Sequence, residues 1–413
     1  MTGRLTLGHS GGPFPNLDGF RAVGCLMVMA NHVAFAANMY DKHPEINRFL
    51  ARFDISIPLF FLVSGFLLFR PFASSLLTQR SWPRLGDYAS NRAWRILPAY
   101  WAAMATAMIW FGVPTVSGAG VFDQHPFGSI AFYSLLLQTF SAQSVFQGFG
   151  EFDQAWSIGT EITFYAALPL VALAWRRAGR DLDPLARRRL ILWSCAGIWI
   201  GAQVWRAWLA SSEASWAPSA AFWLPAHMDF FAIGMAMAAL SVGHGIGLPL
   251  PRWIGYLGDR PWASWMIAGA IWLVVVNPGG ITELFEIRRN PLDFSREYVA
   301  KQLLYGIIGG FAVLPAVFGD QHTGLIRRFL GHRVMVALGA ISLGTYLWHK
   351  CWLTQAEIWT GAEPFQAPFL ITLAITVAGG LASGALCHLL IERPVMERKR
   401  RRSLDRSAKV GVP

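Results

Sequence analysis

Apolar stretches of about 20 residues recur along the whole chain, and they constrain its fold more than any other feature. A helix needs about 20 apolar residues to cross a hydrocarbon core about 30 Å thick. Charged residues make up only 14% of the chain and the mean hydropathy is +0.39, whereas a soluble domain carries about 25% charged residues. These values exclude a soluble globule, a disordered chain and a disulfide scaffold. The ten candidate spans are 17–38, 54–70, 94–113, 156–175, 190–210, 219–241, 262–277, 299–319, 334–354 and 367–391.

The distribution of Lys and Arg decides how the chain is threaded, because cytoplasmic loops carry an excess of these residues. An eleventh apolar stretch, 128–142, is short and polar at both ends. If it does not cross and the other ten do, 25 Lys or Arg lie on one side and six on the other. We therefore predict an all-α polytopic protein with ten transmembrane helices and cytoplasmic termini. Residues 128–150 form a non-spanning or re-entrant segment at the outer face.

The net charge of +11 follows largely from this topology and from attraction to anionic lipid head groups. No basic surface of a folded soluble domain is evident, so we expect membrane lipids and no nucleic acid as partners. We divide the chain into a flexible cytoplasmic N-terminus (1–16), a transmembrane domain (17–395) and a basic cytoplasmic tail (396–413). The first apolar run has no cleavable-signal pattern before it and is expected to stay as a helix.

The four cysteines each stand alone in an apolar run, without the spacing of a metal site. We expect them to be buried apolar side chains that pack between helices, and we expect no metal site. They are Cys25, Cys195, Cys351 and Cys387.

Ionisable residues inside spans are costly and mark function by default. Arg21 and His32 lie eleven residues apart in the first span, which places them on one helix face about 16 Å apart along the axis. Asp18 and Asn31 flank them. The alternative role for His32 is a hydrogen bond that holds two helices together.

Two further ionisable residues reach a depth similar to that of His32. Glu161 lies five residues inside the fourth span, and His349 lies about 15 residues into the ninth. A His–Glu pair at this depth could act as a general base, with the carboxylate orienting the imidazole. A buried polar network that only fixes helix packing is the alternative. Ser64 is either a hydrogen-bond donor to a reacting oxyanion or a small residue at a helix contact.

On the cytoplasmic side, Arg92 and Arg95 stand beside Arg21. Arginine suits bidentate phosphate binding, so this group could hold a nucleotide-like donor. The positive-inside rule by itself would also place Arg92 and Arg95 there.

Seven segments, in order, resemble the acyltransferase 3 family of integral membrane acyltransferases, which are often O-acetyltransferases. They are LDGFRAVGCLMVMANH, IPLFFLVSGFLLFRPF, NRAWRILPAY, WSIGTEITFY, HMDFFAIGMAMA, LGAISLGTYLWH and LLIERPV, and they run from residue 17 to 395. The first contains the family's Arg-x₁₀-His helix. Each segment is weak by itself, but the ordered set is specific. The ten helices and cytoplasmic termini of the family agree with the charge count.

The resemblance implies transfer of an acyl group, usually acetyl from cytosolic acetyl-CoA, to a hydroxyl of a cell-envelope sugar or glycolipid at the plasma membrane. His32 would be the catalytic base or transient acyl acceptor, and Glu161 would assist His32 or the acceptor hydroxyl. Arg21 would help to hold the donor or the histidine, while Arg92 and Arg95 would bind the CoA phosphates.

The sequence departs from the family pattern at two places. Ile162 stands where many relatives have a second acid, so one carboxylate must suffice. Leu343 replaces a tyrosine, which leaves Tyr346 as the nearby hydroxyl. The segment SGFLLFRPF resembles the corresponding segment of actinobacterial members of the family, and this resemblance suggests a trehalose mycolate as the acceptor. A non-catalytic exporter or flippase of a glycan or lipid, with the same intramembrane polar residues as a proton relay, is the alternative function.

Overall fold

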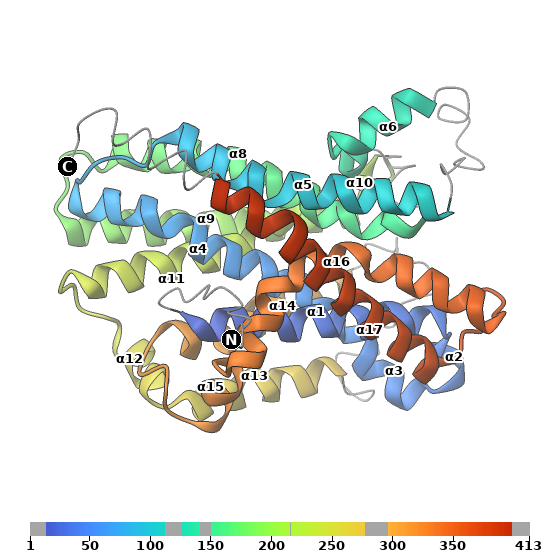
Figure 1. The fold of residues 1–413 in the computed structure, drawn as a ribbon. Coiled ribbons are helices and arrows are strands. Elements are labelled where there is room, and N and C mark those ends of the chain that lie inside the picture. The colour runs from blue at the N-terminus through green and yellow to red at the C-terminus, as the bar shows by residue number, and fades with distance from the viewer. Residues whose placement is uncertain (1–13, 112–125, 141–149, 215, 277–295, 399–413) are drawn as a thin grey trace, which may run out of the picture.

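The fold is a bundle of long helices, seen in a computed structural model that describes residues 14–111, 126–140, 150–214, 216–276 and 296–398 (Figure 1). No strand occurs among these residues, which confirms the all-α prediction for the described part of the chain. The long helices are α1 (Pro15–Ala36), α4 (Ser56–Thr78), α5 (Leu85–Phe111), α8 (Trp156–Ala178), α9 (Pro184–Ala210), α11 (Met228–Gly245), α13 (Pro261–Val276), α14 (Arg296–Val317), α16 (Arg333–Thr360) and α17 (Phe369–Cys387).

Short helical elements join the long ones. They are α2 (Met39–Lys42), α3 (Pro44–Leu50), η1 (Ala51–Ile55), α6 (Pro126–Ser134), η2 (Leu137–Phe140), η3 (Gly150–Ala155), α10 (Ala217–Ala220), η4 (Leu224–His227), α12 (Arg252–Asp259), α15 (Leu325–Leu330) and the π-helical turn η5 (His388–Glu392). In Figure 1, α12 and α15 lie at the left of the bundle, while α2, α3 and α6 lie at the right.

Each of the ten predicted spans overlaps one long helix. Six described segments are long and apolar enough to cross a membrane, and they contain α1, α4, α8, α11, α14 and α17. Of the other four helices, α13 is apolar but short. The protein is therefore a multi-pass membrane protein, while the full count of ten crossings and the side on which each terminus lies stay predictions.

The predicted non-spanning segment is only partly described. Helix α6 has nine residues and η2 has four. At a rise of about 1.5 Å per residue neither can cross a core of about 30 Å. Residues 141–149 lie outside the described part, as do residues 1–13 and 399–413, which hold most of the predicted N-terminal segment and basic tail.

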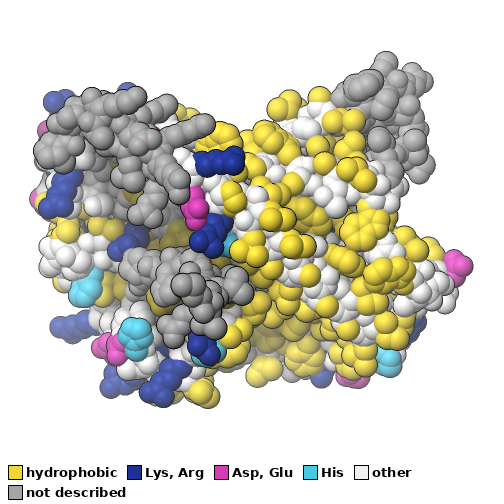
Figure 2. Space-filling model, in the orientation of Figure 1, with side chains coloured by type: hydrophobic (Ala, Val, Ile, Leu, Met, Phe, Trp, Pro, Cys, Tyr) yellow, Lys and Arg dark blue, Asp and Glu magenta, His cyan; other side chains and the backbone are white. Residues whose placement is uncertain are grey.

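Arginine side chains mark one end of the bundle, which we call the basic end. Arg187 at the start of α9 donates to the carbonyl of Leu76 near the end of α4, at 3.4 Å. The buried Arg327 on α15 donates to Pro315 O and Gly258 O, at 2.9 and 2.7 Å. Figure 2 shows Lys and Arg gathered at the left of the view and apolar side chains at the right. We call the other end, where α4, α8 and α11 begin, the opposite end.

Small residues allow the central helices to pack closely, as is usual between membrane helices. A Cβ added to Gly65 of α4 would overlap the backbone of Phe231 on α11. Likewise, a Cβ added to Gly339 of α16 would overlap the backbone of Asp18 on α1. These two contacts fix α4 against α11 and α1 against α16, and three of these helices, α1, α4 and α16, contribute residues to the site.

A buried ion pair joins α9 to α11. Arg206 and Asp229 form it with side chains that are 0% exposed. Gln203 donates to Asp229 at 3.1 Å and accepts from Arg206 at 2.9 Å. Because both charges are paired and hydrogen-bonded, this cluster is satisfied inside the bundle and we assign it a structural role. The four cysteines are also buried, as predicted, and none of them forms a disulfide.

Candidate active site

A pocket of about 850 Å³, counting its open mouth, lies among α1, α4, α5, α8 and α16. Six of the residues predicted from the sequence to belong to the site line it, although they come from five different helices. They are Arg21, Ser64, Arg92, Arg95, Glu161 and Tyr346. The structure thus brings together residues that lie up to 325 positions apart in the chain.

Three guanidinium groups form one part of the pocket wall. Arg21 lies near the start of α1, and Arg92 and Arg95 lie near the start of α5, so all three belong to its basic end. Asp18 is the nearest carboxylate in this group, at a long 3.9 Å from Arg21. The Nε atom of Arg92 is buried and has no hydrogen-bond partner in the described part of the chain. The excess of cationic donors suits an anionic ligand such as a phosphate.

Ser64 and Glu161 both line the pocket, and the Ser64 hydroxyl donates a short hydrogen bond to Oε1 of Glu161. Both side chains are half-buried. The close approach of Gly65 to α11 places this turn of α4 against the bundle centre. The sequence suggested a Glu161–His32 pair instead, but the carboxylate is bonded to Ser64 and no contact between Glu161 and His32 occurs among the described residues.

His32 pairs with His349, and this was not foreseen. Nδ1 of His32 lies 2.7 Å from Nε2 of His349, and the two rings are nearly parallel, with an interplanar angle of 14° and centroids 5.0 Å apart. Nδ1 of His349 lies 2.6 Å from the carbonyl oxygen of Tyr346. His349 is fully buried, whereas His32 is half-buried. The equal depth predicted from helix geometry held for this pair, because α1 and α16 run side by side in the same direction.

These contacts determine which nitrogen atoms carry hydrogen when both rings are neutral. A carbonyl can only accept, so Nδ1 of His349 must donate to Tyr346 O. Nε2 of His349 then accepts from Nδ1–H of His32, which leaves Nε2 of His32 with a free lone pair. A second group that fixes the tautomer of a histidine is a common arrangement for a general base.

Tyr346 connects the histidine pair to the pocket. Its ring lies 5.5 Å from that of His349, and its hydroxyl donates to the carbonyl oxygen of Gln154 at 2.7 Å. The hydroxyl of Ser157 is 2.8 Å from the Tyr346 hydroxyl. Lys350, next to His349, pairs with Asp153 at 3.3 Å. The segment η3 therefore docks on α16 beside the histidines, a contact between an irregular segment and a helix that no sequence pattern indicates.

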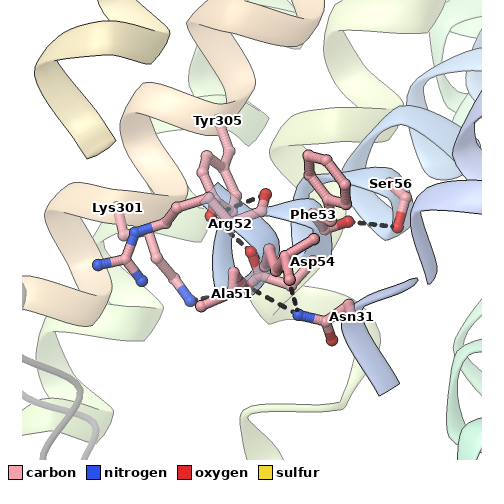
Figure 3. Close-up of polar contacts among 9 residues, drawn as sticks. Asn31, Ala51, Arg52, Phe53, Asp54, Ser56, Lys301 and Tyr305 are labelled. Carbon is pink, nitrogen blue, oxygen red and sulfur yellow. Dashed lines mark hydrogen bonds and ion pairs between the residues drawn. The ribbon is translucent and has the colours of Figure 1, made fainter. Parts of the chain in front are cut away.

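A polar cluster at the opposite end includes Asn31, the residue that precedes His32. Asn31 donates to the carbonyl of Ala51 at 3.2 Å, which fixes η1 beside α1. Within η1, Asp54 accepts from Lys301 at 2.7 Å and from Tyr305 at 2.5 Å. Figure 3 shows Asp54 between these two side chains of α14. This network holds the end of α1 that carries His32.

No group of three or more potential metal ligands occurs in the described ranges. The site consists of three arginines, a Ser–Glu pair and two paired imidazoles. The imidazoles do not line the pocket and lie behind the ring of Tyr346. Such a set can bind an anion, donate a hydrogen bond to a developing oxyanion and accept a proton.

The fold and site together define a multi-pass helical membrane protein with ionisable side chains between its helices. Residues 14–388 match the acyltransferase 3 family model, described as an acyltransferase domain. The chain belongs to this family, as its motifs suggested. Comparison with curated proteins gave no match, and neither did comparison with solved structures.

Proposed function

We propose that the protein transfers an acyl group, most readily acetyl, from acyl-CoA to a hydroxyl group of a cell-envelope sugar or glycolipid at the plasma membrane. The observation that carries the proposal is the polarity of the pocket. Arg21, Arg92 and Arg95 make its basic end, while apolar side chains such as Ile57 and Phe60 make the other end. This polarity suits a donor with phosphates at one end and an acyl thioester at the other.

The three arginines would bind the phosphates of the donor from the cytoplasmic side. A charge-assisted hydrogen bond contributes about 1.5–3 kcal/mol. Replacing Arg92 or Arg95 by glutamine should therefore raise KM for acyl-CoA about 10- to 150-fold while changing kcat less. The matched control is Arg84→Gln, which also alters an arginine near the start of α5 but lies outside the pocket lining. Equal effects of all three replacements would contradict this assignment.

His32 would act as the general base. Its Nε2 takes the proton of the acceptor hydroxyl, whose oxygen attacks the thioester carbon. The Ser64 hydroxyl, which donates to Glu161 in the free protein, is the candidate donor to the oxyanion once its O–H rotates from the carboxylate to the substrate. When the carbon–sulfur bond breaks, the proton on His32 passes to the leaving thiolate. His349 acts as the positioning residue that fixes the tautomer of His32.

Reconstituted protein given labelled acetyl-CoA and extracted envelope glycolipids tests the proposal. We expect labelled glycolipid and an equal release of free CoA, with both lost in His32→Ala protein that still folds. A trehalose mycolate and a mycolate-free glycolipid, offered separately, identify the acceptor class. Movement of the glycolipid across the membrane without CoA release would instead support an exporter that uses the same residues as a proton relay.

A further inference from the structure

The apolar end of the pocket carries a second inference, which rests on the proposed acyl donor. We propose that Phe60, seated against Gly24, sets the length of the acyl group and restricts the donor to short acyl-CoA thioesters. Phe60 is half-buried on α4 and lines the pocket, while Gly24 lies on the neighbouring face of α1.

The Phe60 ring packs against α1 at Gly24, where there is no side chain. A Cβ added to Gly24 would lie 3.1 Å from Cζ and 3.3 Å from Cε1 of Phe60. Both distances are shorter than ordinary van der Waals contact, so the ring occupies the space that a side chain at position 24 would need. Glycine at this position therefore lets the ring lie back against α1 and determines how far it projects into the pocket.

The remaining wall of this end is fixed. The Tyr346 hydroxyl is held by Gln154 and Ser157, and the ring centroids of Tyr346 and Phe60 are 6.4 Å apart. Phe60 has no polar group with which to be held. Of the two rings, Phe60 is therefore the one that a longer acyl chain would contact, and its size and position would limit the length of that chain.

The charge distribution directs the acyl group to this end. The arginines occupy the basic end of the pocket, whereas Ile57, Phe60 and Ile158 come from the first turns of α4 and α8 at the opposite end. A donor whose phosphates lie at the arginines therefore points its thioester toward Phe60. Close-packed interiors do not accept additional methylene groups without displacement of the side chains around them.

The test is a comparison of acetyl-, propionyl-, butyryl- and hexanoyl-CoA as donors for the full-length reconstituted protein. Phe60→Ala should raise the butyryl-to-acetyl ratio of transfer rates about 15-fold, since each newly buried methylene is worth about fourfold. Phe60→Leu should give a smaller rise. Gly24→Ala should lower the propionyl-to-acetyl ratio because its methyl group pushes the ring into the pocket.

Two further variants make the comparison specific. Leu59→Ala shortens the preceding residue, which faces Gly309 of α14 rather than the pocket, and should leave the chain-length profile unchanged. In the double variant Gly24→Ala, Phe60→Ala the effect of Gly24→Ala should vanish, because no ring remains to be pushed.

The outcomes separate this inference from the proposed function. If the wild type transfers acetyl but Phe60→Leu and Phe60→Ala have the same chain-length profile as the wild type, only this inference is overturned. The same holds if the effect of Gly24→Ala persists in the double variant, which has no Phe60 ring. Absence of transfer from every acyl-CoA would overturn both. If Phe60→Ala does not fold, Phe60→Leu and Gly24→Ala still decide the question.

Discussion

Replacement of His349 by phenylalanine would test whether the imidazole pair is the basis of catalysis. The His349 side chain is fully buried, with Nε2 2.7 Å from His32 Nδ1 and Nδ1 2.6 Å from the Tyr346 carbonyl oxygen. Phenylalanine keeps a ring of similar size next to Tyr346 but removes both polar atoms. The Nδ1–H group of His32 then loses its acceptor, and nothing fixes its tautomer.

The size of the effect follows from that loss. Leaving a buried donor unsatisfied costs about 1–3 kcal/mol, which corresponds to about 5- to 150-fold in rate. We expect kcat to fall by this factor while KM for acyl-CoA changes little, because His349 does not line the pocket. Loss of His32 itself should cost about 10²- to 10⁴-fold, as for other general bases.

The assay is labelled acetyl transfer in reconstituted membranes, with thermal unfolding of each variant measured in parallel. His349→Gln offers a carbonyl oxygen as an acceptor for His32 and should recover part of the rate. The exposed His244 at the end of α11 provides the control, since His244→Phe should behave as the wild type. A wild-type kcat in folded His349→Phe protein would refute the positioning role. So would a double variant, His32→Ala with His349→Phe, that transfers acetyl more slowly than His32→Ala alone.

The remaining predictions concern stability, measured by thermal unfolding of the solubilised protein. Gly65→Ala should destabilise the α4–α11 contact by about 1–3 kcal/mol, whereas Gly201→Ala, with open space around the added atom, should be neutral or slightly stabilising. Asp229→Ala should cost about 3–5 kcal/mol because it leaves Arg206 buried without its counter-ion, and Arg206→Met combined with Asp229→Leu should restore most of this loss. Asp183 caps α9, and hydrogen bonds from backbone N–H groups lower its pKa. Its stabilisation is therefore present at neutral pH and lost as the pH falls through the lowered pKa, so the difference between wild type and Asp183→Ala should disappear in acid.

Some of the site was accessible from the sequence because helix geometry is regular. The eleven-residue spacing of Arg21 and His32 defines one face of one helix, and the depth of His349 follows from counting along another. The grouping of Arg21 with Arg92 and Arg95 was also predicted, since all three lie near the basic ends of their helices. Each of these inferences needs only the rise and rotation of a helix and the side on which it begins.

The partner of each polar group was not accessible in the same way. Glu161, His32 and His349 have similar depths, so depth alone allowed a Glu161–His32 pair. The structure instead bonds Glu161 to Ser64 and His32 to His349, because α8 packs beside α4 whereas α1 packs beside α16. Which helix faces which depends on contacts such as that of Gly339 with Asp18, which join segments more than 300 residues apart.

The sequence by itself determined the class of the protein, its helices and the end of the bundle at which its cations gather. These properties follow from the cost of burying charge in lipid and from local periodicity, both of which act on single segments. Only the tertiary structure decided that two histidines form the pair, that Ser64 holds the carboxylate, and that Phe60 rests where Gly24 has no side chain. Those outcomes depend on close packing between distant segments, which no single stretch of sequence contains.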